Sequence, residues 1–94
     1  MTWNEYKEYV KKTDPVSKEI IEEAETEATI ISAMIKQRTS LGLTQRDLAA
    51  LCDIPQSSVA RIESSKTTPR LDTLLKILGK LGLTLRISPL NPAK

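Results

Sequence analysis

The chain of 94 residues is long enough for one small domain with an accessory segment and too short for two full-sized domains. Its 39% hydrophobic and 28% charged residues are typical of a folded globular protein, and no apolar run approaches the ~20 residues that cross a bilayer. The first twelve residues alternate charges with aromatics and lack the apolar centre of a secretory signal, so we expect a cytoplasmic protein. With one cysteine and no histidine, neither an internal disulfide nor a zinc cluster is expected, and Cys52 is predicted to be a small core residue.

The net charge of +2 is unevenly distributed along the chain. Residues 1–35 hold four basic and eight acidic residues, a net charge of −4, whereas residues 36–94 hold ten basic and four acidic residues, a net charge of +6. A basic segment suits a polyanion, and an acidic segment suits a basic protein partner. The acidic run is also typical of a solvated helix face.

The first predicted helix runs from Trp3 to about Lys12, with Thr2 and Glu5 as a capping box. All the aromatic residues of the chain lie in it: Trp3, Tyr6 and Tyr9. Because aromatic side chains are frequent anchors of protein interfaces, this helix is a candidate docking element. The neighbouring acids that we expect to join it are Glu19, Glu22 and Glu23. The alternative is that the aromatic rings fasten the helix to its own bundle.

A second helical segment is predicted from Pro15, with Asp14 as its N-terminal cap, to Leu41. Its apolar residues recur at three- and four-residue spacing. They are Ile20, Ile21, Ala24, Ala28, Ile31, Met34 and Ile35. The pattern leaves open whether this segment is one helix or two that join near residues 25–27, and Gly42 ends it.

Two short helices with a tight turn between them are predicted from Leu43 to Glu63. Thr44 and Asp47 form a capping box, so the first helix begins directly after Thr44. Asp53 can take the left-handed conformation that a sharp turn needs. Pro55 then leads into the second helix, since proline is tolerated at a helix start.

The second of these helices has one arc for burial and one for recognition. At 100° per residue, Ser58, Val59 and Ile62 share the first arc. The opposite arc carries side chains that suit base edges: Arg for guanine, Gln for adenine, Ser for either and Ala for a thymine methyl. The candidate base-reading residues are Gln56, Ser57, Ala60 and Arg61.

A polar loop over residues 64–70 follows and is rich in hydroxyls and positive charge. Such a loop beside a recognition helix can hold the phosphate backbone through backbone N–H groups, Lys66 and Thr67, although a plain surface loop has the same composition. An amphipathic helix is predicted next, with Gly82 as its stop. Its apolar residues are Leu71, Leu74, Leu75, Leu78 and Leu81.

Residues 83–88 alternate apolar and polar side chains, and Pro89 ends the run, which is typical of a β-strand. A single strand cannot satisfy its own backbone groups. We therefore expect this one to pair with the same strand of a second subunit or to join the sheet of a partner. The residues that follow, to Lys94, form a tail.

Residues 38–83 resemble the helix-turn-helix domain of the lambda Cro and XRE repressor class, over about half of the chain. The residues that carry the resemblance are Arg38, Leu41-Gly42-Leu43-Thr44-Gln45, Leu48-Ala49, Gln56-Ser57-Ser58-Val59, Arg61-Ile62-Glu63 and Leu74-Leu75-Lys76. The resemblance implies a mainly α, lambda-repressor-like bundle over residues 36–82. We expect an acidic helical extension at residues 1–35 before it and the short β-strand and tail at residues 83–94 after it.

By position, the family places Gln45 at a phosphate and against the start of the recognition helix, and Ser58 in support of a backbone contact. It pairs Arg38 with Glu63 in a largely structural ion pair. The residues in the family's phosphate-contact loop are Ser64, Lys66 and Thr67. Three residues depart from the family pattern: Asp53 and Ser65 stand where glycines are common, and Pro55 replaces a hydroxyl cap.

With its flanks, the whole chain is similar to HigA-type antitoxins of bacterial type II toxin-antitoxin modules. That resemblance implies a small basic RelE-like or HigB-like toxin that cuts mRNA as partner. It also implies a homodimer that binds operator DNA and represses its own operon. The alternatives are a stand-alone XRE-family repressor without a toxin and an adaptor that has lost DNA binding. No enzyme and no cofactor are expected, because there is no histidine, no phosphate-binding glycine loop and no nucleophile beside the carboxylates.

Overall fold

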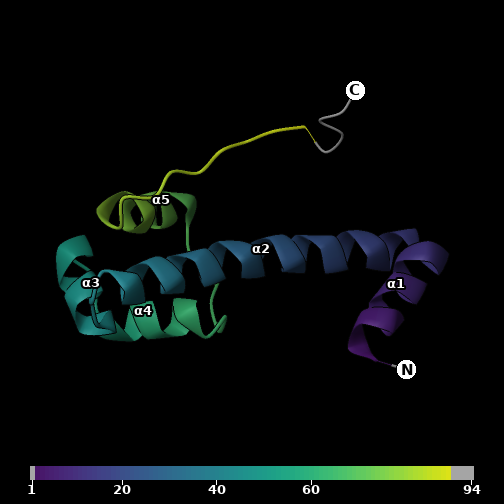
Figure 1. Ribbon diagram of the computed structural model, residues 1–94, viewed down its shortest axis with the longest axis horizontal. Coiled ribbons are helices and arrows are strands. Elements are labelled where there is room, and N and C mark those ends of the chain that lie inside the picture. Colours follow the sequence, from purple (N-terminus) through teal and green to yellow (C-terminus); the bar gives the residue numbers. More distant parts are fainter. Residues whose placement is uncertain (1, 90–94) are drawn as a thin grey trace. The chain divides into compact units, whose positions relative to one another are not determined.

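The computed structural model describes residues 2–89, and that part of the chain contains five helices (Figure 1). They are α1 (Trp3–Thr13), α2 (Pro15–Ser40), α3 (Gln45–Cys52), α4 (Gln56–Glu63) and α5 (Leu71–Lys80). The chain divides into two compact units, Met1–Ser32 and Ala33–Lys94, and α2 contributes residues to both. None of the helices described is long and apolar enough to cross a membrane.

The start of α2 is fixed by Asp14. Its carboxylate accepts hydrogen bonds from the backbone N–H of Val16 at 3.2 Å and of Ser17 at 3.3 Å, and from the Ser17 hydroxyl at 2.7 Å. These bonds, that of the Ser17 hydroxyl most of all, lower the pKa of the Asp14 carboxyl. The predicted helix start at Pro15 is confirmed, and the segment that follows is one continuous helix.

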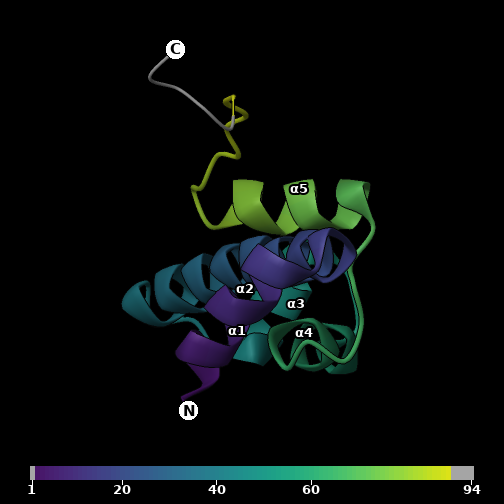
Figure 2. The same ribbon diagram turned by 90° about the vertical axis from the view of Figure 1, so that its right-hand side faces the viewer.

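The core of the second unit consists of side chains from α2 to α5. α3 packs against both α4 and α5, and in both views the C-terminal part of α2 lies between α4 and α5 (Figure 1 and Figure 2). Cys52 is 1% exposed, which confirms the prediction that it is a core residue. The buried residues are Met34, Leu48, Ala49, Cys52, Val59, Ile62, Ile77, Leu78 and Leu81.

The four helices that contribute to the second unit end in the same way. Each is followed by a residue with a positive φ angle, and a backbone N–H beyond it reaches back to a carbonyl in the last turn, which is the Schellman motif. These residues are Gly42 (φ 73°), Asp53 (φ 55°), Ser65 (φ 61°) and Gly82 (φ 76°). The returning hydrogen bonds run from Leu43 to Arg38, Ile54 to Ala49, Lys66 to Arg61 and Leu83 to Leu78.

The buried face of α5 differs from the predicted leucine stripe. Ile77 is fully buried, whereas Leu71 and Leu75 are 65% and 48% exposed. With Leu78 and Leu81, Ile77 forms one arc of the helix that faces the core. At 100° per residue Leu71 lies next to Leu78 at the edge of this arc and Leu75 lies farther from it, so a stripe of five leucines is wider than the face that the bundle covers.

The predicted β-strand over residues 83–88 is wrong. Residues 83–89 form neither helix nor strand, because a β-ladder needs a second strand and residues 2–89 offer none. The alternating pattern also buries little, since Leu85 is 39% exposed and Ile87 is 96% exposed. The tail expected after this run, residues 90–94, lies outside the described residues.

The left-handed conformation of Ser65 predicts opposite effects of glycine at two adjacent serines. Ser65→Gly should raise the free energy of unfolding by about 0.5–1 kcal/mol, because glycine adopts a positive φ without steric strain. Ser64→Gly should lower it, because Ser64 has φ −88° and its hydroxyl donates to the Arg61 carbonyl. Urea denaturation followed by circular dichroism measures both values. Equal destabilisation by the two substitutions would contradict the argument.

Candidate functional site

α4 presents one face to the core and the other to solvent. Val59 is fully buried and Ile62 is 4% exposed, which fixes the rotation of the helix about its axis. The predicted base-reading residues that are exposed are Gln56, Ser57 and Arg61. Ala60 is half-buried at the margin of this face, and so is Ser58. The polar row predicted from the helical period therefore lies on the open side of α4.

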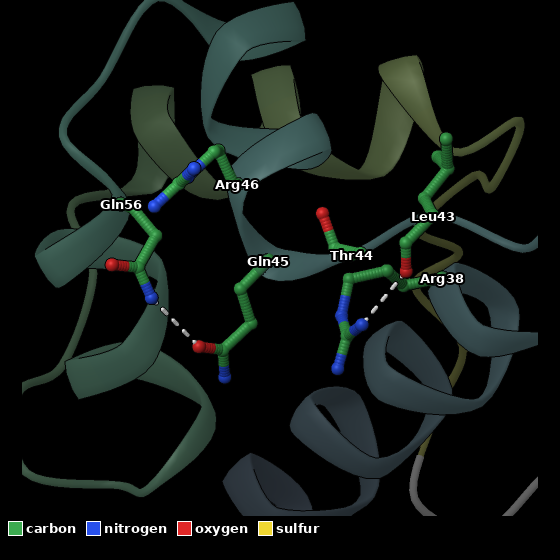
Figure 3. Close-up of a pocket in the computed structure, with 6 residues that line it drawn as sticks. All are labelled: Arg38, Leu43, Thr44, Gln45, Arg46 and Gln56. Carbon is green, nitrogen blue, oxygen red and sulfur yellow. Dashed lines mark hydrogen bonds between the residues drawn. The ribbon is translucent and has the colours of Figure 1, made fainter.

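Gln56 is held at the start of α4 by a contact with α3. Its side-chain Nε2 donates a hydrogen bond to Oε1 of Gln45 at 3.0 Å (Figure 3). The Nε2 of Gln45 in turn donates to Oε1 of Glu63 at 2.9 Å. Gln45, which begins α3, thus connects the first residue of α4 with its last residue. This connection was not predicted beyond the position of Gln45 against the recognition helix.

This series of hydrogen bonds ends at the ion pair between Glu63 and Arg38. The guanidinium of Arg38 donates from Nε to Oε2 of Glu63 at 2.6 Å and from Nη2 to Oε1 at 2.9 Å. Its Nη1 donates to the carbonyl oxygen of Leu43 at 2.8 Å (Figure 3). The two side chains are 12% and 6% exposed, so the pair is largely shielded from water. Such a two-pronged arrangement is the strongest geometry that arginine and a carboxylate form.

In the loop after α4, several backbone N–H groups are already used in hydrogen bonds within the protein. The N–H groups of Ser64, Ser65 and Lys66 donate to carbonyls of α4 and are not free for phosphate. In the described part of the chain, the N–H groups of Thr67 and Thr68 donate to no protein acceptor. The side chains of Ser64, Lys66 and Thr67 are exposed. A phosphate contact in this loop would therefore use Lys66, the hydroxyls and the later N–H groups.

Arg46 is a further candidate contact, in addition to the residues predicted from the sequence. Its exposed side chain lies in the same surface hollow as Gln45 and Gln56 (Figure 3). A guanidinium beside a base-reading amide suits a phosphate or a guanine edge. The signal in the sequence was its position directly after Gln45, in the first turn of a helix adjoining α4.

The three aromatic rings of α1 are open to solvent. Trp3, Tyr6 and Tyr9 are 65%, 48% and 58% exposed, and no residue of α1 is buried. Trp3 and Tyr6 stack with their ring centroids 5.9 Å apart, and Nζ of Lys7 lies 5.8 Å from the Trp3 ring. About half or more of each aromatic residue is therefore exposed and remains available to a partner.

An apolar hollow lies between α1 and the first part of α2. Beside it, the carboxylate of Glu25 forms ion pairs with Lys11 at 2.7 Å and Lys7 at 3.6 Å, and these hold α1 against α2. The residues that line the hollow are Trp3, Lys7, Ile20, Ile21, Ala24, Glu25 and Ala28. The helical spacing of these aliphatic residues predicts a packing stripe, and no sequence motif distinguishes Glu25 from the other acids of α2.

The structure does not gather the predicted acids with the aromatic rings. Glu19, Glu22 and Glu23 are exposed, but at 100° per residue they lie on the arc of α2 opposite the hollow. The six residues predicted to contact a toxin therefore form two surfaces, an aromatic one on α1 and an acidic one on α2. Proximity in the sequence did not distinguish the two sides of the helix.

Three comparisons with known proteins cover most of this chain. A family model described as "Helix-turn-helix" matches residues 34–87. An uncharacterized HTH-type transcriptional regulator from Haemophilus influenzae is 39% identical over 89 residues, which are 95% of this chain and 86% of that protein. A solved structure described as a toxin-antitoxin module from Streptococcus pneumoniae is similar with a TM-score of 0.74 and 36% identity. That likeness covers 96% of this chain and 94% of the other.

The Lys11–Glu25 pair predicts that α1 loosens in acid. The hydrogen bond from Lys11 holds the pKa of the Glu25 carboxyl below its usual value of 4.5. A carboxyl with a lowered pKa stabilises the folded state above about pH 4.5, and this contribution is lost as the pH falls through its folded pKa. Iodide quenching of Trp3 fluorescence should therefore increase on acidification.

Two glutamine variants separate this pair from the other carboxyls. In Glu25→Gln the quenching should already be high at neutral pH and should change little in acid. Glu23→Gln, on the opposite arc of α2, should behave as the unmodified chain does. Far-ultraviolet circular dichroism shows whether helices are retained over the same range. An unchanged acid response in Glu25→Gln would rule out the ion pair as its cause.

Proposed function

Because the chain belongs to the helix-turn-helix family of transcriptional regulators, we propose that it is a DNA-binding antitoxin of the HigA type. As a homodimer it binds operator DNA through α4 and represses its own operon. Through its first unit it neutralises a small basic RelE-like or HigB-like toxin that cuts mRNA. The likeness to a toxin-antitoxin module over nearly the whole chain carries this proposal beyond DNA binding alone.

The DNA-binding part of the proposal rests on the exposed face of α4. Gln56, Ser57 and Arg61 extend from a helix whose other side is anchored in the core, as recognition in a major groove requires. Ala60, at the margin of the face, suits a thymine methyl. A two-fold dimer would place its two recognition helices about 34 Å apart, one turn of DNA. The proposed backbone contacts are Gln45, Ser58, Ser64, Lys66 and Thr67, with Arg38 and Glu63 as the supporting ion pair.

The toxin-binding part of the proposal rests on the first unit. The structural similarity to the toxin-antitoxin module includes this unit, since it covers 96% of the chain. Trp3, Tyr6 and Tyr9 offer exposed aromatic area, and Trp3 also lines the apolar hollow; both features are typical of the centre of a protein interface. The acids of the opposite arc are a second surface that favours a basic partner: Glu19, Glu22 and Glu23.

A stand-alone repressor is the alternative, and the relative from Haemophilus influenzae favours it. The description of that protein names a transcriptional regulator and no toxin, although the similarity covers 95% of this chain. In this case the chain would still bind operator DNA through α4. The first unit would then have another role, and no neighbouring small basic protein would form a complex with it.

Two substitutions distinguish base reading from backbone binding. Arg61→Ala should cost roughly 1–3 kcal/mol on the operator and relax the preference at one base pair. Lys66→Ala should weaken binding to all duplexes alike and reduce the slope of log affinity against log salt by about 1. Fluorescence anisotropy with the upstream promoter duplex and a scrambled duplex measures both effects. Equal losses on the two duplexes for Arg61→Ala would exclude its base-reading role.

Co-expression with the adjacent small basic reading frame tests the toxin partner. The full chain should restore growth and co-purify with the basic protein, and Trp3→Ala should reduce both effects. Leu75→Ala, which removes exposed apolar area from α5, is the matched control and should leave both unchanged. If the neighbouring protein neither arrests growth nor binds the chain, the stand-alone repressor is the correct assignment.

A further inference from the structure

The two hydrogen bonds that link Gln56 to Glu63 through Gln45 have only one possible direction. A carboxylate accepts hydrogen bonds and donates none, so the Gln45 side chain must turn its NH₂ group toward Glu63. The carbonyl oxygen of Gln45 is then left to face Gln56. Since that oxygen can only accept, Gln56 must turn its own NH₂ group toward Gln45. The carboxylate of Glu63 thus determines the orientation of two amides.

This direction decides what Gln56 offers to a ligand. One hydrogen of its Nε2 is used on Gln45, which leaves the second hydrogen and the Oε1 acceptor. Within residues 2–89, neither of these takes part in a hydrogen bond, and the side chain is exposed. The remaining pair is one donor beside one acceptor. Adenine presents the complementary pair in the major groove, with N7 as acceptor and N6–H as donor.

The opposite amide orientation would favour a different base. A glutamine amide with its NH₂ group turned outward offers two donors, and guanine presents two acceptors at N7 and O6. A freely rotating Gln56 would sample both orientations. A Gln56 fixed by Gln45 places Oε1 where it would repel guanine O6. Fixing the amide therefore adds discrimination against guanine to the hydrogen bonds made with adenine.

We propose that Glu63 is a positioning residue for base recognition: through Gln45, its carboxylate fixes the amide of Gln56 in the orientation that reads adenine. The inference rests on the proposed DNA-binding function and adds a specificity-determining role to a residue whose own side chain is largely shielded from solvent. Arg38 supports it, because the forked contact holds both carboxylate oxygens in place. The Glu63 side chain is 6% exposed and its hydrogen bond to Gln45 is partly buried, so water competes little for the carboxylate.

The test compares the base preferences of the full chain and its variants. Duplexes are selected from a randomised pool by the unmodified chain, and the position whose preference Gln56→Ala removes is identified. We expect adenine there, with a discrimination of roughly 5- to 160-fold over the other bases. Glu63→Gln should reduce this discrimination severalfold, with guanine gaining most. The preference that depends on Arg61 should remain unchanged in the same experiment.

Two further variants separate amide orientation from stability. Arg38→Lys removes the forked contact but keeps a group at residue 63 that only accepts, so the chain should become less stable and still prefer adenine. Gln45→Met keeps the ion pair and breaks the connection to Gln56, so it should lose the adenine preference. Thermal unfolding followed by circular dichroism establishes which variants are folded. If Glu63→Gln does not fold, Gln45→Met provides the same test.

The outcomes distinguish this inference from the function on which it rests. A folded Glu63→Gln or Gln45→Met variant that discriminates adenine as strongly as the unmodified chain overturns the inference. A position dependent on Gln56 that prefers another base also overturns it and leaves DNA recognition by α4 intact. If the unmodified chain selects no sequence from the pool, sequence-specific DNA binding fails, and the inference fails with it.

Discussion

The geometry of the second unit depends on the ion pair between Arg38 and Glu63. It joins α2 to the last residue of α4, and Nη1 of Arg38 also holds the carbonyl of Leu43 before α3. A buried ion pair of this kind is weak evidence of net stability, because removing two charges from water costs several kcal/mol per ion. Its contribution is positional: the loss of either partner would leave a charge without compensation. Within the described residues, no buried side-chain nitrogen or oxygen lacks a hydrogen-bond partner, so the polar contacts around this pair are complete.

The helix ends show how far local sequence determines this fold. Thr44 and Asp47 form the predicted capping box, and Asp53 takes the predicted left-handed conformation. Both could be predicted because they depend on side-chain chemistry within a few residues. Ser65 takes the same conformation without any local preference for it. There, two hydrogen bonds of the Schellman motif and the buried Ile62 impose the backbone angle, so tertiary structure outweighs propensity. At residues 83–88 the local pattern favours a strand, but no strand forms because the described residues contain no second strand to pair with.

The candidate site also combines features that local sequence predicts with features that depend on how the helices pack. The exposed polar side chains of α4 could be predicted from the sequence. The helical period of 100° per residue places them opposite the buried Val59 and Ile62. The connection through Gln45 could not be predicted, because Gln45 is 11 residues from Gln56 and 18 from Glu63. Contacts at such separations depend on how α3 packs against α4, and no local pattern encodes that packing. In the first unit the aromatic residues are exposed, and their role as a docking element stays a prediction; the acids near them were grouped with them by proximity in the chain. The helical period places those acids on the other side of α2.

The two units achieve order by different physical means, and the difference suits the two proposed roles. The second unit has an aliphatic core and a hydrogen-bond network that ends on a shielded ion pair, so it can hold the amide of Gln56 before DNA arrives. Such preorganisation reduces the entropy that ordering a side chain costs on binding, and it is what base discrimination requires. α1 has no buried residue and forms its ion pairs with α2 through the Glu25 carboxylate, which is 44% exposed and therefore screened by water and salt. Little free energy then fixes its position in the isolated chain. A protein partner that covers Trp3, Tyr6 and Tyr9 would supply the apolar burial that α1 lacks, so toxin binding and ordering of α1 should occur together.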